Sequence, residues 1–229
     1  DPGDASDEDL TDGIFFPKTF RSALENANLD PGFNAIGFHE SLTIIQPSNA
    51  YTELNSTGSV WIDGTVDAGK IVLDGSSDWQ FGLWMIGGSS ILTNMIITNF
   101  PGGGLVLQGN ENVVEGCEIY SNGGFGINCN SLTNSLIGGD LLEEGNLIWG
   151  NSGSGAYGIA LIAGCHNNTV KNNLIGTKDG VTPNGNEKDG ILIDESNYNL
   201  IVENTICDND GGIYIKGSST IGTIIEKNY

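Results

Sequence analysis

Gly190-Ile191-Leu192-Ile193 is one of six short segments in which a glycine is followed by alternating residues of mainly apolar character. The other five have the same form and are Gly82-Leu83-Trp84-Met85, Gly104-Leu105-Val106-Leu107, Gly126-Ile127-Asn128-Cys129, Gly158-Ile159-Ala160-Leu161 and Gly212-Ile213-Tyr214-Ile215. Successive glycines lie 22, 22, 32, 32 and 22 residues apart. A fixed period of this length is typical of a solenoid, and alternation with period two indicates strands. The sequence therefore predicts an all-β solenoid of the parallel β-helix type.

The same segments predict which side chains face the core. The first and third residues after each glycine, such as Ile191 and Ile193, should point inward, and the residue between them should point outward. The outward column is unusually apolar for an exposed sheet face: Trp84, Val106, Asn128, Ala160, Leu192 and Tyr214. Either a loop or an insertion covers this column, or the column is a binding surface. In the second case Trp84 and Tyr214 are the candidate ligand-binding residues, because aromatic rings stack on sugars.

Charge limits the possible partners. The chain of 229 residues carries 8 basic and 29 acidic residues, a formal net charge of −21. Such a chain repels nucleic acid, and it repels anionic polysaccharides unless a divalent cation bridges them. Acidity can also simply keep a solenoid with a large surface in solution. No apolar run is long enough to span a bilayer, so the sequence predicts no transmembrane segment.

The chain divides into a short tail and one domain. Residues 1–13 are acidic without an apolar period and read as a flexible tail, and residues 14–229 are predicted to form a single β-helix domain. Within that domain, residues 19–29 predict an amphipathic helix that covers the open end of the solenoid. Calcium is a possible cofactor through Asp7, Asp9 and Asp12, but the glycine falls one place late for a calcium loop, so a solvated tail is the simpler explanation of these acids. No other metal site is expected.

A buried asparagine ladder is predicted from recurring Asn-x-Ile elements. The candidate rungs are Asn94, Asn146, Asn173 and Asn204, with Cys117 as one rung and Asn228 as the next, and stacked amides can bond from coil to coil. Of the remaining cysteines, Cys129 reads as a small buried hydrophobe. The four cysteines show no disulfide framework or metal spacing, and the disulfide state of Cys117, Cys129, Cys165 and Cys207 stays open.

Two insertions account for the longer coils. They run from 138 to 145 and from 176 to 188, and both are expected to interrupt the same part of successive coils. They should therefore protrude from one side as an acidic ridge. Its carboxylates would be Asp140, Glu143, Glu144, Asp179 and Glu187.

Three stretches resemble a known family. Residues 19–38 (TFRSALENANLDPGFNAIGF) resemble the segment that opens CSLREA-type bacterial and archaeal surface proteins, with Thr19-Phe20-Arg21 in place of Ser-Leu-Arg and without the leading Cys. Residues 134–148 and 175–191 resemble the coils of the same proteins that carry "IGG…GN" and "IGT…GN…DGI". The resemblance covers residues 19–229. It implies a right-handed parallel β-helix of the pectate-lyase-like superfamily and an extracellular or cell-surface location, without an assigned reaction.

Catalytic residues are sparse. Asp194 lies next to Lys216 in the repeat, which reads most simply as an interstrand ion pair. Glu195, Asp208 and Asp210 fall on nearby turns and complete the one acid cluster worth testing, and the coils contain no arginine. The sequence thus favours a non-catalytic extracellular or cell-surface protein for adhesion, envelope structure or glycan binding. One alternative is a polysaccharide lyase or glycoside hydrolase that uses this cluster. The other is a structural protein that self-assembles through open solenoid ends.

Overall fold

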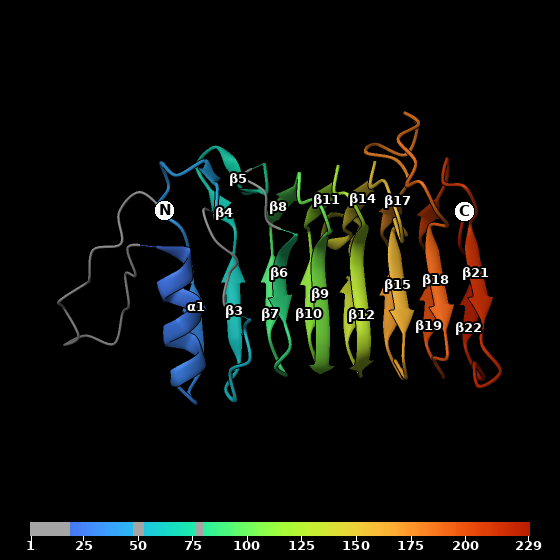
Figure 1. The fold of residues 1–229 in the computed structure, drawn as a ribbon, viewed down its shortest axis with the longest axis horizontal. Helices are drawn as coiled ribbons and strands as arrows, with labels where there is room; N and C mark the ends of the chain where they lie inside the picture. The colour runs from blue at the N-terminus through green and yellow to red at the C-terminus, as the bar shows by residue number, and fades with distance from the viewer. Residues whose placement is uncertain (1–18, 48–52, 77–79) are drawn as a thin grey trace.

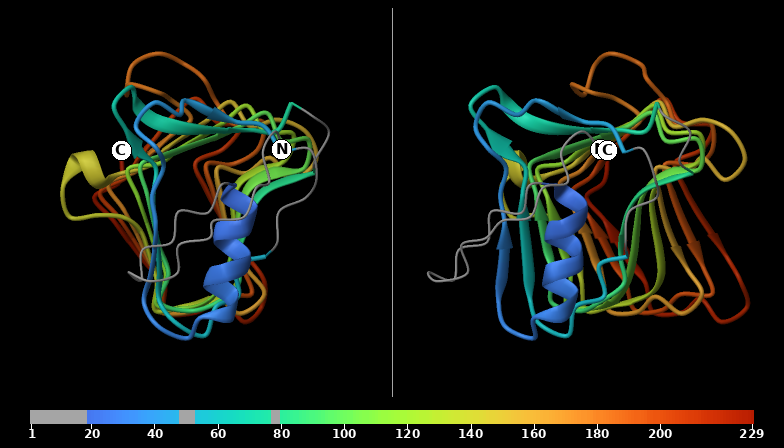
Figure 2. Two further views of the ribbon diagram at one scale, coloured as in Figure 1. Left: turned by 90° about the vertical axis from the view of Figure 1, so that its left-hand side faces the viewer. Right: turned by 60° about the vertical axis from the view of Figure 1, so that its left-hand side comes forward.

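The computed structural model describes residues 19–47, 53–76 and 80–229. Its strands stack into three sheets along one axis, with helix α1 (Phe20–Leu29) at one end and strand β21 at the other (Figure 1). Seen along that axis, successive coils superimpose as a three-sided outline (Figure 2). The predicted parallel β-helix with an N-terminal helix is confirmed. The acidic tail, including Asp7, Asp9 and Asp12, lies outside the described residues.

The three sheets, here called A, B and C, are visited in turn along the chain. Sheet A has the order β1 (Asn34–Ile36), β3 (Val60–Asp63), β7 (Ile91–Thr93), β10 (Val113–Glu115), β13 (Leu136–Gly138), β16 (Thr169–Lys171), β19 (Leu200–Val202) and β22 (Ile224–Glu226). Sheet B has the order β2 (Ile44–Ile45), β5 (Gly69–Asp74), β8 (Met95–Thr98), β11 (Glu118–Tyr120), β14 (Leu147–Trp149), β17 (Leu174–Ile175) and β20 (Thr205–Ile206). Sheet C has the order β6 (Phe81–Met85), β9 (Gly103–Asn110), β12 (Phe125–Thr133), β15 (Ile159–Ile162), β18 (Ile191–Asp194) and β21 (Ile213–Lys216). All these pairings are parallel, and the short β4 (Thr65–Val66) pairs antiparallel with β5.

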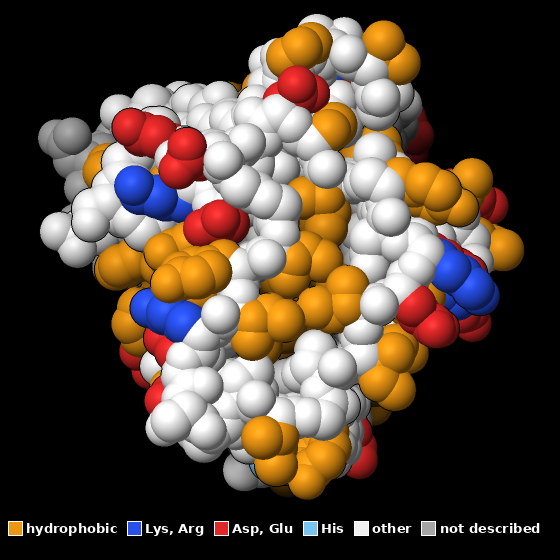
Figure 3. Space-filling model, turned by 90° about the vertical axis from the view of Figure 1, so that its right-hand side faces the viewer, with side chains coloured by type: hydrophobic (Ala, Val, Ile, Leu, Met, Phe, Trp, Pro, Cys, Tyr) orange, Lys and Arg blue, Asp and Glu red, His pale blue; other side chains and the backbone are white. Residues whose placement is uncertain are grey.

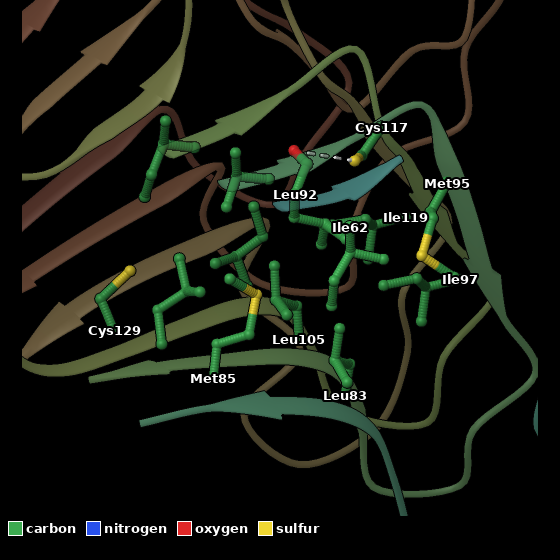
Figure 4. Packing of buried hydrophobic residues seen from close by; sticks show 14 of the residues in the cluster. Ile62, Leu83, Met85, Leu92, Met95, Ile97, Leu105, Cys117, Ile119 and Cys129 are labelled. Atoms are coloured by element: carbon green, nitrogen blue, oxygen red, sulfur yellow. Dashed lines mark hydrogen bonds between the residues drawn. The ribbon is translucent and has the colours of Figure 1, made fainter. Parts of the chain in front are cut away.

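The core consists of stacked aliphatic side chains from all three sheets (Figure 4). On sheet C, Ile191 pairs in register with Ile159 and Ile213, and Ile193 pairs with Leu161 and Ile215. Ile191 and Ile193 are fully buried, as the alternation predicts. Each buried aliphatic side chain contributes about 1.5–3 kcal/mol. The inward register read from the glycine segments is therefore correct.

Helix α1 closes one end of this core. Thr19 caps it, because its hydroxyl accepts a hydrogen bond from the Ser22 amide at 3.1 Å. Its buried face is the predicted one and consists of Phe20, Ala23, Leu24 and Ala27. This face covers the apolar interior of the first coil, so the lid function expected of the helix is what the structure shows.

The predicted asparagine ladder runs along the corner between sheets A and B. Each asparagine accepts a hydrogen bond from the backbone amide of the rung before it, and the rungs are Cys117, Asn146, Asn173, Asn204 and Asn228. The prediction that Asn94 is a rung is wrong. In the register of β8 and β11, Met95 is level with Cys117, and Asn94 lies one residue earlier. Asn94 adopts φ 57° on the corner and donates to Thr65 Oγ1 at 3.0 Å.

Two further ladders, which were not predicted from the sequence, line the other corners. Between sheets B and C the rungs are Asn122, Asn151, Asn186 and Asn209. Between sheets C and A they are Asn112, Ser135, Asn168 and Asn199. In both ladders a rung's side-chain oxygen accepts from the backbone amide of the previous rung, at 2.9–3.2 Å. Buried polar backbone is thus satisfied at all three corners.

The two insertions leave the solenoid at different corners, so the prediction of one acidic ridge is wrong. Residues 138–145 connect sheet A to sheet B and contain the short helix η1 (Leu142–Glu144), whereas residues 176–188 connect sheet B to sheet C (Figure 2). Both begin with Ile-Gly at the end of a strand, which makes them look equivalent in sequence. The strand pairing distinguishes them: β13, before the first insertion, belongs to sheet A, whereas β17, before the second, belongs to sheet B.

At the other end of the solenoid the inward side chains of the last coil are exposed (Figure 3). Ile215 and Ile225 are 46% and 40% exposed, whereas the residues level with them in the preceding coil, Ile193 and Ile201, are fully buried. The difference shows how much of the burial in every earlier coil comes from the coil that follows it.

Candidate functional site on the outer face of sheet C

Sheet C carries a continuous uncharged surface built from the repeat. Strands β6, β9, β12 and β15 contain no Asp, Glu, Lys or Arg, although the whole chain has a net charge of −21. We use the name sheet C face for the outward side chains Phe81, Trp84, Val106, Gln108, Phe125, Asn128, Asn130, Tyr157, Ala160, Leu192 and Tyr214. On the four uncharged strands, aromatic rings and carboxamides are the stacking and polar groups of this face, and β18 and β21 add the ion pair of Asp194 and Lys216 at its edge.

The aromatic rings form a cluster at one end of the face. Phe81 and Phe125 stack with ring centroids 5.7 Å apart and planes 12° apart, and Trp84 meets Phe81 edge-on at 5.6 Å. The two phenylalanines reach each other because Gly103 lies between them in register, and a Cβ on Gly103 would overlap the Phe125 ring. Glycine at this position therefore makes the stack possible.

Part of the outward column is buried, which the sequence left open. Val106, Ala160 and Leu192 are only 4–5% exposed. Their neighbours on the same face are large: Trp84 is in register with Val106, and Tyr214 with Leu192. The apolar column is thus the floor between aromatic side chains of the sheet C face. Trp84 is half-buried and Tyr214 is 47% exposed.

The two predicted stacking residues share this face but lie far apart. Trp84 is on β6 and Tyr214 on β21, the two edge strands, so five strand spacings or about 24 Å separate them. They cannot hold one sugar ring together. Phe81 and Phe125 are the residues that sequence reasoning missed. Each directly precedes a repeat glycine, Gly82 or Gly126, and this is the signal that could have found them.

The structure separates the predicted acid cluster into two groups. Asp194 and Lys216 form the expected interstrand ion pair at 3.2 Å, and this contact, with weaker effects of Tyr157 and Tyr214, raises the pKa of Lys216. Glu195 lies just beyond Asp194 and accepts from the Ser218 amide. Asp208 and Asp210 are exposed on the corner before β21, at the opposite end of that strand.

Sheets A and B each carry one aromatic feature outside the sheet C face. On sheet B, Tyr120 and Trp149 are in register and stack with centroids 4.2 Å apart and planes 5° apart. On sheet A, Trp61 is 40% exposed and its indole N–H donates to Thr93 Oγ1 at 3.0 Å. These sites lack the continuous uncharged surroundings of sheet C, because Glu118 and Asp63 lie on the same strands.

Three aspartates accept hydrogen bonds that favour the charged carboxylate and lower its pKa. Bonds from the Thr182 amide and hydroxyl and the Val181 amide lower the pKa of Asp179 to about 2. For Asp63 and Asp74, burial alone would raise the pKa, but hydrogen bonds from Thr65 and Gln46, respectively, with those of further neighbours, lower it. Each of these groups stabilises the fold above its unfolded value of 3.8 and loses that contribution as the pH falls through its folded pKa.

We therefore expect the melting temperature to fall as the pH is lowered from 5 to 2. Glu115 acts in the opposite direction, because burial and the nearby Glu144 and Asp140 raise its pKa. It is one group against four, since the hydrogen bond with Lys171 lowers the pKa of Asp140 as well. Circular dichroism melts at half-unit pH steps measure the effect. In Asp179→Ala the drop should be smaller than in the wild type, and a melting temperature that stays constant down to pH 2 would contradict the assignment.

Among the described residues no group of three His, Cys, Asp or Glu side chains could hold a metal ion. His39 and His166 are exposed on distant coils, and each bonds only locally, to Ser41 and to the Gly164 carbonyl. All four cysteines are free. Cys117, Cys129 and Cys165 are buried, and burial raises the pKa of each thiol, to about 12 for Cys117.

Among solved structures, the chain is similar to the A-module of mannuronan C-5 epimerase AlgE4 from Azotobacter vinelandii. The sequence identity is 12%, the TM-score is 0.55, and the match covers 91% of this chain and 72% of that chain. At this identity the likeness concerns the fold and confirms the expected right-handed β-helix class. No curated protein matches the chain.

A family model described as periplasmic copper-binding protein (NosD) matches residues 91–229, more than half of the chain. The match includes strands β9 to β21 of sheet C. The described histidines, cysteines and acids do not fit a copper centre, because no three of them come together as ligands. A periplasmic family confirms the predicted location outside the cytoplasm, and no helix in residues 19–47, 53–76 and 80–229 is long and apolar enough to cross a bilayer. The chain belongs to the NosD family of periplasmic β-helix proteins.

Proposed function

We propose that the protein binds a neutral polysaccharide on the sheet C face and releases it chemically unchanged. The observation that carries the proposal is the absence of any charged residue from four successive strands, β6, β9, β12 and β15, in a chain of net charge −21. A face that served only solubility would carry its share of the acids. An uncharged face with aromatic rings instead favours an uncharged, partly apolar ligand.

The chemistry of the face suits sugar rings. Aromatic side chains offer large flat surfaces with modest conformational freedom, and Phe81, Trp84 and Phe125 present three of them side by side. The carboxamides of Gln108, Asn128 and Asn130 can both donate to and accept from hydroxyl groups. Polyuronates are disfavoured, because the surrounding acidic molecule repels them at long range. The AlgE4 module, named for an epimerase of mannuronan, shows that this fold also occurs in a protein that acts on a polysaccharide.

The rival function, a carbohydrate-active enzyme, would need the acid cluster. Asp194 is held by Lys216 at 3.2 Å, and Asp208 and Asp210 lie at the other end of β21. Glu195 is engaged with the Ser218 amide. This arrangement supports binding over turnover, because no two of these carboxylates flank a common point on the sheet C face.

Affinity gel electrophoresis tests the proposal. The gels would contain a β-glucan, a β-mannan, a β-xylan, alginate or pectate, the last two with and without calcium. We expect at least one neutral polysaccharide to retard the wild type and neither uronate to do so. Trp84→Ala should weaken the retardation about tenfold, because removing an aromatic contact residue commonly costs that much affinity. Trp61→Ala, an exposed tryptophan on sheet A, is the matched control and should behave as wild type.

Reducing-end release and ultraviolet absorbance of unsaturated products are measured on the same panel. Neither should change. No retardation by any neutral polysaccharide would contradict the proposed binding. Turnover that Asp194→Asn abolishes would replace it with the enzymatic alternative.

A further inference from the structure

Asn128 occupies the centre of the sheet C face. It lies on β12, in register with Val106 on β9 and Ala160 on β15. Both neighbours are apolar and only 5% exposed, so neither offers a hydrogen-bond donor or acceptor to the Asn128 side chain. Asn128 is thus the one carboxamide on this column of the face, set into an apolar floor on the same strand as Phe125, whose ring stacks on Phe81.

The side-chain oxygen of Asn128 is buried and has no hydrogen-bond partner in the described part of the protein. Exchanging the oxygen and nitrogen of the amide would bury an unpaired N–H instead, so one polar end stays unpaired in either orientation. The corner asparagines differ: Asn146, for example, donates to the Val114 carbonyl at 2.9 Å and to the Asn173 side chain at 2.9 Å. A buried polar group without a partner destabilises a fold, and leucine would be the more stable choice at this position.

We propose that Asn128 is a specificity-determining residue whose half-buried carboxamide hydrogen-bonds a hydroxyl group of a neutral sugar ring stacked on the aromatic cluster. This inference rests on the proposed function of the same face. A hydroxyl suits the position because it can donate to the oxygen or accept from the N–H. An ammonium or carboxylate group would place a charge on an uncharged apolar floor, which is unfavourable without a charged partner. The recognised ligand is therefore a hydroxyl-rich, uncharged polymer.

The test compares stability and affinity in Asn128→Leu, which has nearly the same volume and no polar end. Its melting temperature should equal or exceed that of the wild type, because a buried unpaired amide is removed. Its affinity for the neutral polysaccharide that retards the wild type most should fall about tenfold, the loss of one hydrogen bond in a desolvated site. If the role of Asn128 were only structural, the substitution would lower both the melting temperature and the affinity.

Thr169→Leu is the matched control outside the sheet C face: Thr169 is half-buried on sheet A, in register with Leu136 and Leu200. It should keep affinity within about twofold of the wild type. Wild-type affinity in Asn128→Leu would overturn the inference while leaving the proposed function standing. A lower melting temperature would also overturn it, by showing that the amide has a partner. Failure of the wild type to bind any neutral polysaccharide would overturn both.

Discussion

Ile191→Asp is expected to unfold the coils around β18. Ile191 is fully buried and stacks in register between Ile159 and Ile213. An aspartate there would place a carboxylate without a partner in the core and would remove the aliphatic contacts with both neighbours. Mutations of this kind lower the free energy of unfolding by more than about 4 kcal/mol. Urea denaturation followed by circular dichroism measures the loss, and we expect the β-sheet signal to be reduced even without urea.

The neighbouring Leu192→Asp is the control. The sequence predicts that it is tolerated far better, because Leu192 points outward. In the structure Leu192 is 4% exposed, so its substitution also has a cost, about 1–3 kcal/mol, although the carboxylate can turn toward solvent. Equal losses in the two variants would show that the inward register of sheet C is wrong.

Asn173→Leu is the second large effect. The Asn173 side chain accepts from the Asn146 amide and carboxamide and donates to the Ile137 carbonyl and to Asn204, all at 2.9–3.0 Å. Leucine fits the volume but leaves the buried polar groups of both neighbouring rungs unpaired. Each unpaired group costs about 1–3 kcal/mol, so we expect a loss of about 3–5 kcal/mol in the free energy of unfolding.

Urea titration again provides the measurement, with Asn130→Leu as the comparison because this asparagine belongs to no ladder. That control should change the free energy of unfolding by less than about 0.5 kcal/mol. A loss below 1 kcal/mol in Asn173→Leu would mean that the ladder contributes little, and the stability of the solenoid would then rest on the aliphatic stacks alone.

The repeat made the fold predictable, because a glycine and an alternating apolar segment fix both the period and the inward face. The ladders were only partly predictable. Asn94-Met95-Ile96 has the form of a rung element, yet Met95 and not Asn94 is level with Cys117. The ladder between sheets C and A repeats the same form, as in Asn199-Leu200-Ile201, and was missed. The ladder between sheets B and C has no comparable motif, since its asparagines occupy corners whose lengths vary.

The sheet C face was predictable as a column but not as a site. Trp84 and Tyr214 follow from the repeat, whereas the stack of Phe81 on Phe125 needs three strands and the missing side chain of Gly103. Whether Asn128 has a partner depends on the burial of its oxygen and on neighbours from two other coils. The position of the four acids relative to one another also needs the structure, which puts Asp194 and Glu195 at the end of β18 and Asp208 and Asp210 before β21.

The proposed function has two halves: the sheet C face binds a neutral polysaccharide, and it leaves that polysaccharide chemically unchanged. Isothermal titration calorimetry with oligosaccharides of a β-glucan, a β-mannan and a β-xylan, followed by mass spectrometry of the recovered sugar, tests both halves in one sample. We expect saturable binding of at least one neutral oligosaccharide, lost in Trp84→Ala and retained in Trp61→Ala, with the sugar recovered intact. Absence of binding to every neutral oligosaccharide, or recovery of a cleaved or altered sugar, would contradict the proposed function.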